Sequence, residues 1–219
     1  ISTDRGYIDR FRGRIIFPLH SQMGKVIGFA GRAFNENQIA KYINSPETEV
    51  FRKGHALYNL SNACTPARQT NTMVIAEGYM DVIALCRSGF PNTVAPLGTA
   101  LTENQIQQLW RFVPEPVLCF DGDEAGQRAA RRAAEHTLPN LSAGLSLRFA
   151  FLPSGEDPDS MITKGDRESL ARAIQNPISL IDYIWSCEVD NRPLDTPERK
   201  ASFKQRLNKL VSQIKDKAI

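Results

Sequence analysis

The chain has 219 residues, of which 42% are hydrophobic and 23% are charged, enough for one sizeable domain or two to three small subdomains. No stretch approaches the roughly 18 apolar residues of a membrane span, and no leader of basic and then apolar residues indicates secretion. We therefore expect a cytoplasmic protein without a membrane partner. The four cysteines are widely spaced and form no C-x-x-C pair, which excludes a zinc ribbon and a dense disulfide framework.

The net charge of +3 hides a segregation along the chain. Residues 1–70 carry ten Lys/Arg and five Asp/Glu, a net of +5, and residues 164–219 carry eleven and eight, a net of +3. The middle segment, 71–163, carries six and eleven, a net of −5. An acidic centre between basic flanks favours a metal site beside a surface for polyanions.

The first seventy residues predict a small α+β subdomain. Runs of β-branched and aromatic residues at 14–20 and 25–32 flank a turn-prone segment, which predicts a hairpin. Residues 34–60 have no clear period and are expected to be mostly loop with short elements. The polar segment 66–72 is the predicted boundary to a second subdomain.

From Met73 onward the pattern alternates between strands and helices. Strands are predicted at 73–76, 92–97, 116–120 and 145–152. Helices are predicted at 79–87, 102–112 and 124–138, the second opened by Thr102 with Gln105 three residues later. Alternating strands and helices of these lengths predict an α/β fold with a mostly parallel sheet flanked by helices.

After Pro158 only helices are predicted, at 159–175, 178–190 and 196–217, the last opened by a Thr cap followed by Pro. The expected division is therefore a basic α+β subdomain over 1–70, an acidic α/β domain over 71–163 and a C-terminal helical bundle over 164–219.

Acidic residues follow three of the predicted strands. Glu77 comes directly after the first strand and Asp121 and Asp123 come directly after the third, while Glu156, Asp157 and Asp159 follow the fourth. The carboxyl ends of parallel strands lie at one edge of a sheet, where ligands bind, so these side chains are expected to converge. Carboxylates gathered together repel one another unless a cation neutralises them. Hard oxygen ligands without His or Cys favour Mg²⁺ or Mn²⁺ over zinc.

Each acid has a simpler interpretation when it is taken alone. Asp123 precedes a helix and is suited to cap it, and Asp81 is suited to the first turn of its helix. The Asp121-Gly-Asp123 run also suggests an EF-hand, but positions 5 and 12 of such a loop would be Ala125 and Arg132, which excludes it. Three acidic motifs at the ends of three strands nevertheless favour a metal site.

The motifs resemble those of DnaG-type bacterial primases, whose metal-binding part is a Toprim domain. The acidic domain contains Glu77-Gly-Tyr-Met-Asp-Val82, Pro96-Leu-Gly-Thr99, Phe120-Asp-Gly-Asp-Glu-Ala-Gly126 and Phe151-Leu-Pro-Ser-Gly-Glu-Asp-Pro-Asp159. The basic subdomain contains Gly28-Phe-Ala-Gly-Arg32, Lys41-Tyr-Ile-Asn-Ser-Pro-Glu-Thr48 and Phe51-Arg-Lys-Gly54. The resemblance covers nearly the whole chain.

The resemblance implies a DNA-directed RNA polymerase that makes short RNA primers on single-stranded DNA for replication. Its implied metal core for Mg²⁺ or Mn²⁺ is Glu77, Asp121 and Asp123, and its implied outer acids are Asp81, Asp157 and Asp159. The implied binding groove for template or nucleotide phosphates consists of Arg32, Lys41, Tyr42, Asn44 and Lys53.

Further partners also follow from the resemblance alone. These are ribonucleoside triphosphates, the RNA–DNA hybrid and the replicative helicase. The family carries a zinc-binding N-terminal domain and a helicase-docking C-terminal domain, and we expect neither within these 219 residues, so autonomous primer synthesis by this segment is expected to be weak or absent. Two alternatives stay open: another Toprim enzyme, such as a nuclease, and a non-catalytic nucleic-acid-binding module.

Overall fold

The computed structural model describes residues 2–3, 6–35, 40–98, 100–190 and 192–219. Its first part is a small antiparallel sheet of three strands, β3 (Arg14–His20), β4 (Val26–Ala33) and β5 (Tyr42–Asn44), in that order. A further two-stranded pair precedes it, β1 (Ser2–Thr3) with β2 (Gly6–Tyr7). The β3–β4 pairing confirms the predicted hairpin.

The second part is a five-stranded sheet with the order β10-β9-β8-β6-β7. Four strands run parallel: β6 (Val74–Ile75), β7 (Thr93–Val94), β8 (Val117–Phe120) and β9 (Arg148–Phe151). Each lies within a segment predicted as a strand. The mostly parallel sheet expected from the alternating pattern is therefore confirmed.

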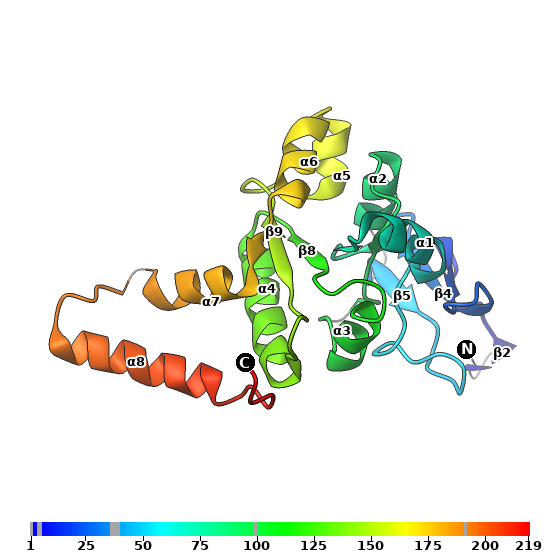
Figure 1. Ribbon diagram of the computed structural model, residues 1–219. Helices are drawn as coiled ribbons and strands as arrows, with labels where there is room; N and C mark the ends of the chain where they lie inside the picture. The colour runs from blue at the N-terminus through cyan, green and yellow to red at the C-terminus, as the bar shows by residue number, and fades with distance from the viewer. Residues whose placement is uncertain (1, 4–5, 36–39, 99, 191) are drawn as a thin grey trace.

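Helices cover both faces of this sheet (Figure 1). They are α1 (Leu60–Thr70), α2 (Tyr79–Arg87), α3 (Glu103–Leu109), α4 (Glu124–Thr137) with the short η1 (Leu138–Asn140), α5 (Pro158–Thr163), α6 (Arg167–Gln175), α7 (Leu180–Val189) and α8 (Pro197–Val211). The capping box of Thr102 and Gln105 is present at the start of α3, as predicted.

Alternate residues of each strand enter separate cores on the two faces, as the pleat requires. On one face Ile75 and Leu118 pack with side chains from α1, α3, α4 and α7. On the other face Val74 and Cys119 pack with side chains from α2, α5 and α6. A third core, which includes Phe17 and Tyr79, joins the small sheet to α2.

Three expectations for the C-terminal part are wrong. The segment 159–175 is not one helix, because α5 ends at Thr163, Gly165 adopts a positive φ of 82° and Asp166 caps the start of α6. The part after Pro158 is not purely helical either, since β10 (Ile178–Ser179) pairs antiparallel with β9. The last helix ends at Val211, six residues before the predicted end.

The segment 66–72, where the sequence predicts a boundary, is the end of α1 followed by a turn. Ala63 and Ala67 of α1 are buried in the core of the five-stranded sheet, so the helix at this junction packs as part of the second unit. The divisions near residues 70 and 163 remain a proposal. Among the helices that the structure describes, none combines the length and the apolar character that a membrane crossing requires.

Candidate metal and nucleic-acid site

A cleft of about 320 Å³ lies where the carboxyl edge of the parallel sheet meets the small basic sheet. Its acidic lining residues are Glu77, Asp81, Asp121, Asp157 and Asp159. Its remaining lining residues include Arg32, Lys41, Tyr42, Asn44, Tyr79 and Gly98. The structure thus brings five of the six predicted metal ligands and four of the five predicted nucleic-acid residues into one cleft.

Two predicted residues do not line this cleft. Asp123 is exposed and caps α4, with its Oδ1 accepting a hydrogen bond from the Gly126 N–H over 2.7 Å. Lys53 lies near the start of α3, where its carbonyl accepts a hydrogen bond from Gln105 Nε2 over 3.1 Å. Their predicted roles therefore have less geometric support than those of the other residues.

The acidic side chains are held by short turns after the strands. The Asp121 N–H donates to Oε1 of Glu77 over 3.2 Å, which ties the ends of β8 and β6 together. Asp157 caps α5 through the Ser160 N–H over 2.6 Å. Asp157 therefore both caps α5 and lines the cleft.

At Gly122 the turn after β8 packs directly against the turn after β9. A Cβ atom at this position would lie 1.7 Å from the Pro153 carbonyl oxygen, and the Gly122 N–H donates to the Glu156 carbonyl over 2.9 Å. Gly126 is similarly close to the Asp121 carbonyl, 2.3 Å from a Cβ atom. At both glycines the missing side chain makes room for the chain's own backbone.

The carboxylates perturb one another because they are gathered in a partly buried place. Burial, followed by the charge of Asp157, raises the pKa of Asp81 to about 7. Burial, followed by the charge of Glu77, raises the pKa of Asp121 to about 7. The pKa of Glu77 is also raised by burial, against the opposing hydrogen bond from the Asp121 N–H. These groups favour either a proton or a cation among them.

The donor set fits a hard divalent cation, since every acid in the cleft offers only carboxylate oxygens. Within the described ranges, no three His, Cys, Asp or Glu side chains are already grouped as metal ligands. The residues therefore fit Mg²⁺ or Mn²⁺ in chemistry but are not assembled into a closed cage. Open oxygen sites of this kind leave room for water and for substrate phosphates.

The opposite wall supplies cations and an aromatic ring. The guanidinium carbon of Arg32 lies 6.0 Å from the centroid of the Tyr42 ring. Strand pairing fixes Lys41 beside them, because its carbonyl accepts a hydrogen bond from the Ala33 N–H over 2.8 Å. Tyr42 is 36% exposed. A ring beside two cations can stack a base while the cations bind phosphates.

Tyr79 was not among the predicted site residues, although it lies within the Glu77–Val82 motif. Its hydroxyl donates to Asn44 Oδ1 over 2.9 Å, and its ring stacks on Phe17 with centroids 5.4 Å apart. Burial raises its pKa to about 12. The sequence gave no signal of this hydrogen bond, since the partner Asn44 lies 35 residues away along the chain.

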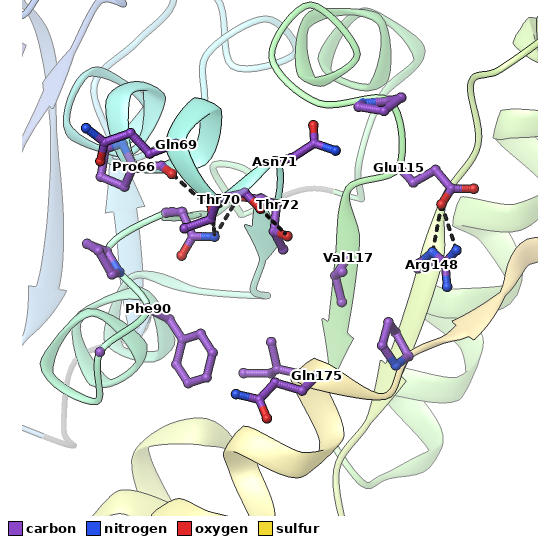
Figure 2. A pocket seen from close by; sticks show the side chains of 16 residues that line it. Pro66, Gln69, Thr70, Asn71, Thr72, Phe90, Glu115, Val117, Arg148 and Gln175 are labelled. Carbon is purple, nitrogen blue, oxygen red and sulfur yellow. Dashed lines mark hydrogen bonds and ion pairs between the residues drawn. The ribbon is translucent and has the colours of Figure 1, made fainter.

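A larger cavity lies elsewhere. It measures about 660 Å³, and its lining includes residues at the amino ends of the parallel strands, such as Thr72, Asn92 and Val117. Figure 2 shows Glu115 and Arg148 paired at its side, at 2.8 Å. Because this pair is neutral overall and the other described lining residues carry no charge, the cavity offers neither a cluster of acids for a metal nor a cluster of cations for a polyanion.

Comparison with known proteins identifies the family. The family described as DNA primase catalytic core, N-terminal domain, matches residues 1–64, and the Toprim domain family matches residues 71–150. The DNA primase of Pseudomonas putida is 47% identical over 199 residues, which are 89% of this chain and 30% of that protein. The DNA primase of Escherichia coli strain K12 is 40% identical over 215 residues, 98% of this chain and 37% of that protein.

Solved structures extend the likeness to the whole fold. The Escherichia coli primase catalytic core superposes with a TM-score of 0.90 at 39% identity, covering 100% of this chain and 70% of that one. A DNA primase domain from Pseudomonas aeruginosa gives a TM-score of 0.88 at 41% identity, covering 99% and 68%. A DnaG primase catalytic domain bound to single-stranded DNA gives 0.88 at 39% identity, covering 100% and 70%. The resemblance deduced from the motifs is thus confirmed, and the chain belongs to the DnaG family of bacterial DNA primases.

Proposed function

We propose that this chain is the polymerising part of a primase that makes short RNA primers on single-stranded DNA by metal-dependent nucleotidyl transfer. The observation that carries the proposal is the single cleft that is lined by five carboxylates on one side and by Arg32 and Lys41 on the other. One wall suits a divalent cation and the other suits phosphates. A nucleotidyl transfer requires both within reach of one reacting phosphate.

In the proposed reaction the primer 3′-hydroxyl attacks the α-phosphate of a ribonucleoside triphosphate, and pyrophosphate leaves. Glu77, Asp121 and Asp123 would hold Mg²⁺ or Mn²⁺, with Asp81, Asp157 and Asp159 as outer acids. Such an ion, when bound, lowers the pKa of the attacking hydroxyl and offsets the charge of the phosphates. Arg32 and Lys41 bind and orient phosphates from the opposite wall, and Tyr42 offers its ring to a base.

The partners proposed for this surface are single-stranded DNA, ribonucleoside triphosphates and the RNA–DNA hybrid. The similarity to a primase catalytic domain solved with single-stranded DNA supports the first of these. Because the chain spans 30% of the Pseudomonas putida primase, the helicase contact and the zinc domain are proposed for other parts of the protein. A cytoplasmic location is proposed with them.

The test is incubation of the complete protein with a single-stranded template, labelled ribonucleoside triphosphates and Mg²⁺ or Mn²⁺. Labelled oligoribonucleotides that depend on the template and the metal are expected. Cleavage of the template would instead indicate a nuclease, and retention of DNA without any product would indicate a binding module. Soaking crystals with Mn²⁺ tests the site itself, with density expected beside Glu77, Asp121 and Asp123. Density confined to surface contacts would contradict the metal assignment.

A further inference from the structure

Helix α4 carries three arginines, and their surroundings differ. Arg128 forms an ion pair with Glu124 at 3.3 Å, and Arg131 forms one with Glu135 at 3.2 Å. Arg132 takes part in no ion pair or hydrogen bond with the part of the chain that the structure describes. Its positive charge instead acts on the carboxyl group of Glu77.

Arg132 lines a second cleft, of about 270 Å³, between α4 and the carboxyl ends of β6 and β8. The described lining is mostly apolar and includes Leu118 and Phe120, and its charged side chains are Glu77 and Arg132. Glu77, Pro96 and Gly98 line both this cleft and the first cleft, which contains the five acids. The two clefts therefore adjoin, with the Glu77 carboxylate between them.

An arginine without a partner beside apolar walls favours an anion. The planar guanidinium offers paired N–H donors that match two oxygens of a phosphate. Glu77 alone would repel any anion, so the arrangement favours an anion that also reaches a cation held at Glu77, as two neighbouring phosphate groups can.

We propose that this second cleft is a phosphate subsite, in which Arg132 binds a phosphate group of a substrate whose neighbouring phosphate lies at the acidic edge. The proposal rests on the proposed function and adds to it a subsite on the far side of Glu77. Two sources share this chemistry: the triphosphate of an incoming ribonucleotide and the backbone of the nucleic acid. Either source places a polyphosphate or a phosphodiester chain across Glu77.

The test compares Arg132→Ala, Arg132→Lys and Arg128→Ala in the complete protein with Mg²⁺. Equilibrium binding is measured for a fluorescent ATP analogue and, over a range of salt concentrations, for a labelled single-stranded DNA. Arg128→Ala is the matched control, since it removes an equal charge from the same helix but leaves the cleft unchanged. Thermal melting checks the fold, which should persist because Arg132 is exposed and alanine is a good helix former.

We expect Arg132→Ala to weaken binding of one ligand about tenfold, with Arg132→Lys in between because lysine keeps the charge but loses the paired donors. Weaker ATP-analogue binding with an unchanged DNA salt slope assigns the subsite to the triphosphate. Weaker DNA binding, with a slope lower by about one, assigns it to the backbone. Unchanged binding of both ligands would overturn the proposal, as would an equal loss in Arg128→Ala.

The outcome is separable from that of the proposed function. A wild-type protein that makes primers, together with an Arg132→Ala variant of wild-type affinity, would sink the subsite and leave the function intact. If the wild-type protein makes no primers but Arg132→Ala weakens nucleotide binding, the proposed function fails and the phosphate subsite stands.

Discussion

The phenolic hydroxyl of Tyr79 donates a hydrogen bond to Oδ1 of Asn44 over 2.9 Å, which joins the first residue of α2 to the last residue of β5. The Asn44 amide is used on its other side as well, since Nδ2 donates to the Leu97 carbonyl over 3.0 Å. Asn44 was predicted to bind nucleic acid. In the folded chain its amide holds the basic strand against the acidic edge.

Replacing Tyr79 by Phe removes this hydrogen bond and keeps the ring. We expect a loss of about 1 kcal/mol in the free energy of unfolding, the usual net value for one hydrogen bond, and weaker single-stranded DNA binding because β5 loses its anchor. Tyr58→Phe is the matched control: the Tyr58 ring packs edge-on against Tyr79 at 4.9 Å, and its hydroxyl has no hydrogen-bond partner among the described residues. Equal effects of the two variants would contradict the anchoring role.

Replacing Asp123 by Asn separates capping from metal binding. Asn caps helices about as well as Asp, so the melting temperature should hardly change, or rise slightly without metal because a repelling charge is removed. Primer synthesis should fall severely, and Glu77→Gln should behave in the same way. Asp123→Ala should additionally cost about 1 kcal/mol of stability from the lost cap. Wild-type synthesis by Asp123→Asn would defeat the metal assignment at that position.

The raised pKa values of Asp81 and Asp121, each about 7, predict a stability that depends on pH. Because the folded state holds these protons more tightly than the unfolded state, the stabilisation is present at low pH and is lost as the pH rises through about 7. In EDTA, raising the pH from about 6 to about 8.5 should lower the melting temperature of the wild type more than that of Asp121→Asn. Added Mn²⁺ should reduce the difference. Parallel pH curves would argue against the raised pKa values.

Lys41 and Lys53 should differ in their contributions to DNA binding. Lys41 lines the cleft between the carboxyl edge of the parallel sheet and the small basic sheet, and Lys53 does not. Lys41→Ala should weaken single-stranded DNA binding and lower the salt slope by about one or less. Lys53→Ala, the matched charge removal outside the cleft, should have a smaller effect on both. A larger effect at Lys53 would move the DNA path away from this cleft.

Glu188 should control whether α8 stays docked. Its side chain is 6% exposed and accepts hydrogen bonds from Arg206 of α8 at 2.5 Å and from Arg192 at 2.9 Å. No described residue of α8 is buried, and beside this pairing the Phe203 ring of α8 contacts the Trp185 ring of α7 with centroids 5.3 Å apart. Glu188→Gln should make α8 more sensitive to trypsin without unfolding the sheet, because breaking a buried ion pair is costly. Asp195→Asn, which breaks an exposed pair with Arg199, should not.

The sequence was sufficient for those features that local patterns determine. Strand segments, the α2 bounds and the convergence of Glu77, Asp121 and Asp157 follow from alternation and from the geometry of parallel sheets. The antiparallel strand β10 was missed because two residues carry no period, and its pairing with Phe149 is a long-range contact. The contact of Tyr79 and the proposed role of Arg132 were missed because both depend on what lies opposite the side chain in space.

The contact at Gly122 has a consequence for the spacing of the acids. With no room for a side chain between residue 122 and the Pro153 carbonyl, the turn that carries Asp121 and the turn that leads to Asp157 form one stiff piece. This main-chain contact therefore sets the distance between the carboxylates of Asp121 and Asp157. An inserted residue in the 153–156 turn would alter that distance without touching any acid, and Gly122→Ala would force the two turns apart. If the proposed metal binds here, loop length would therefore determine its ion preference as much as ligand identity does.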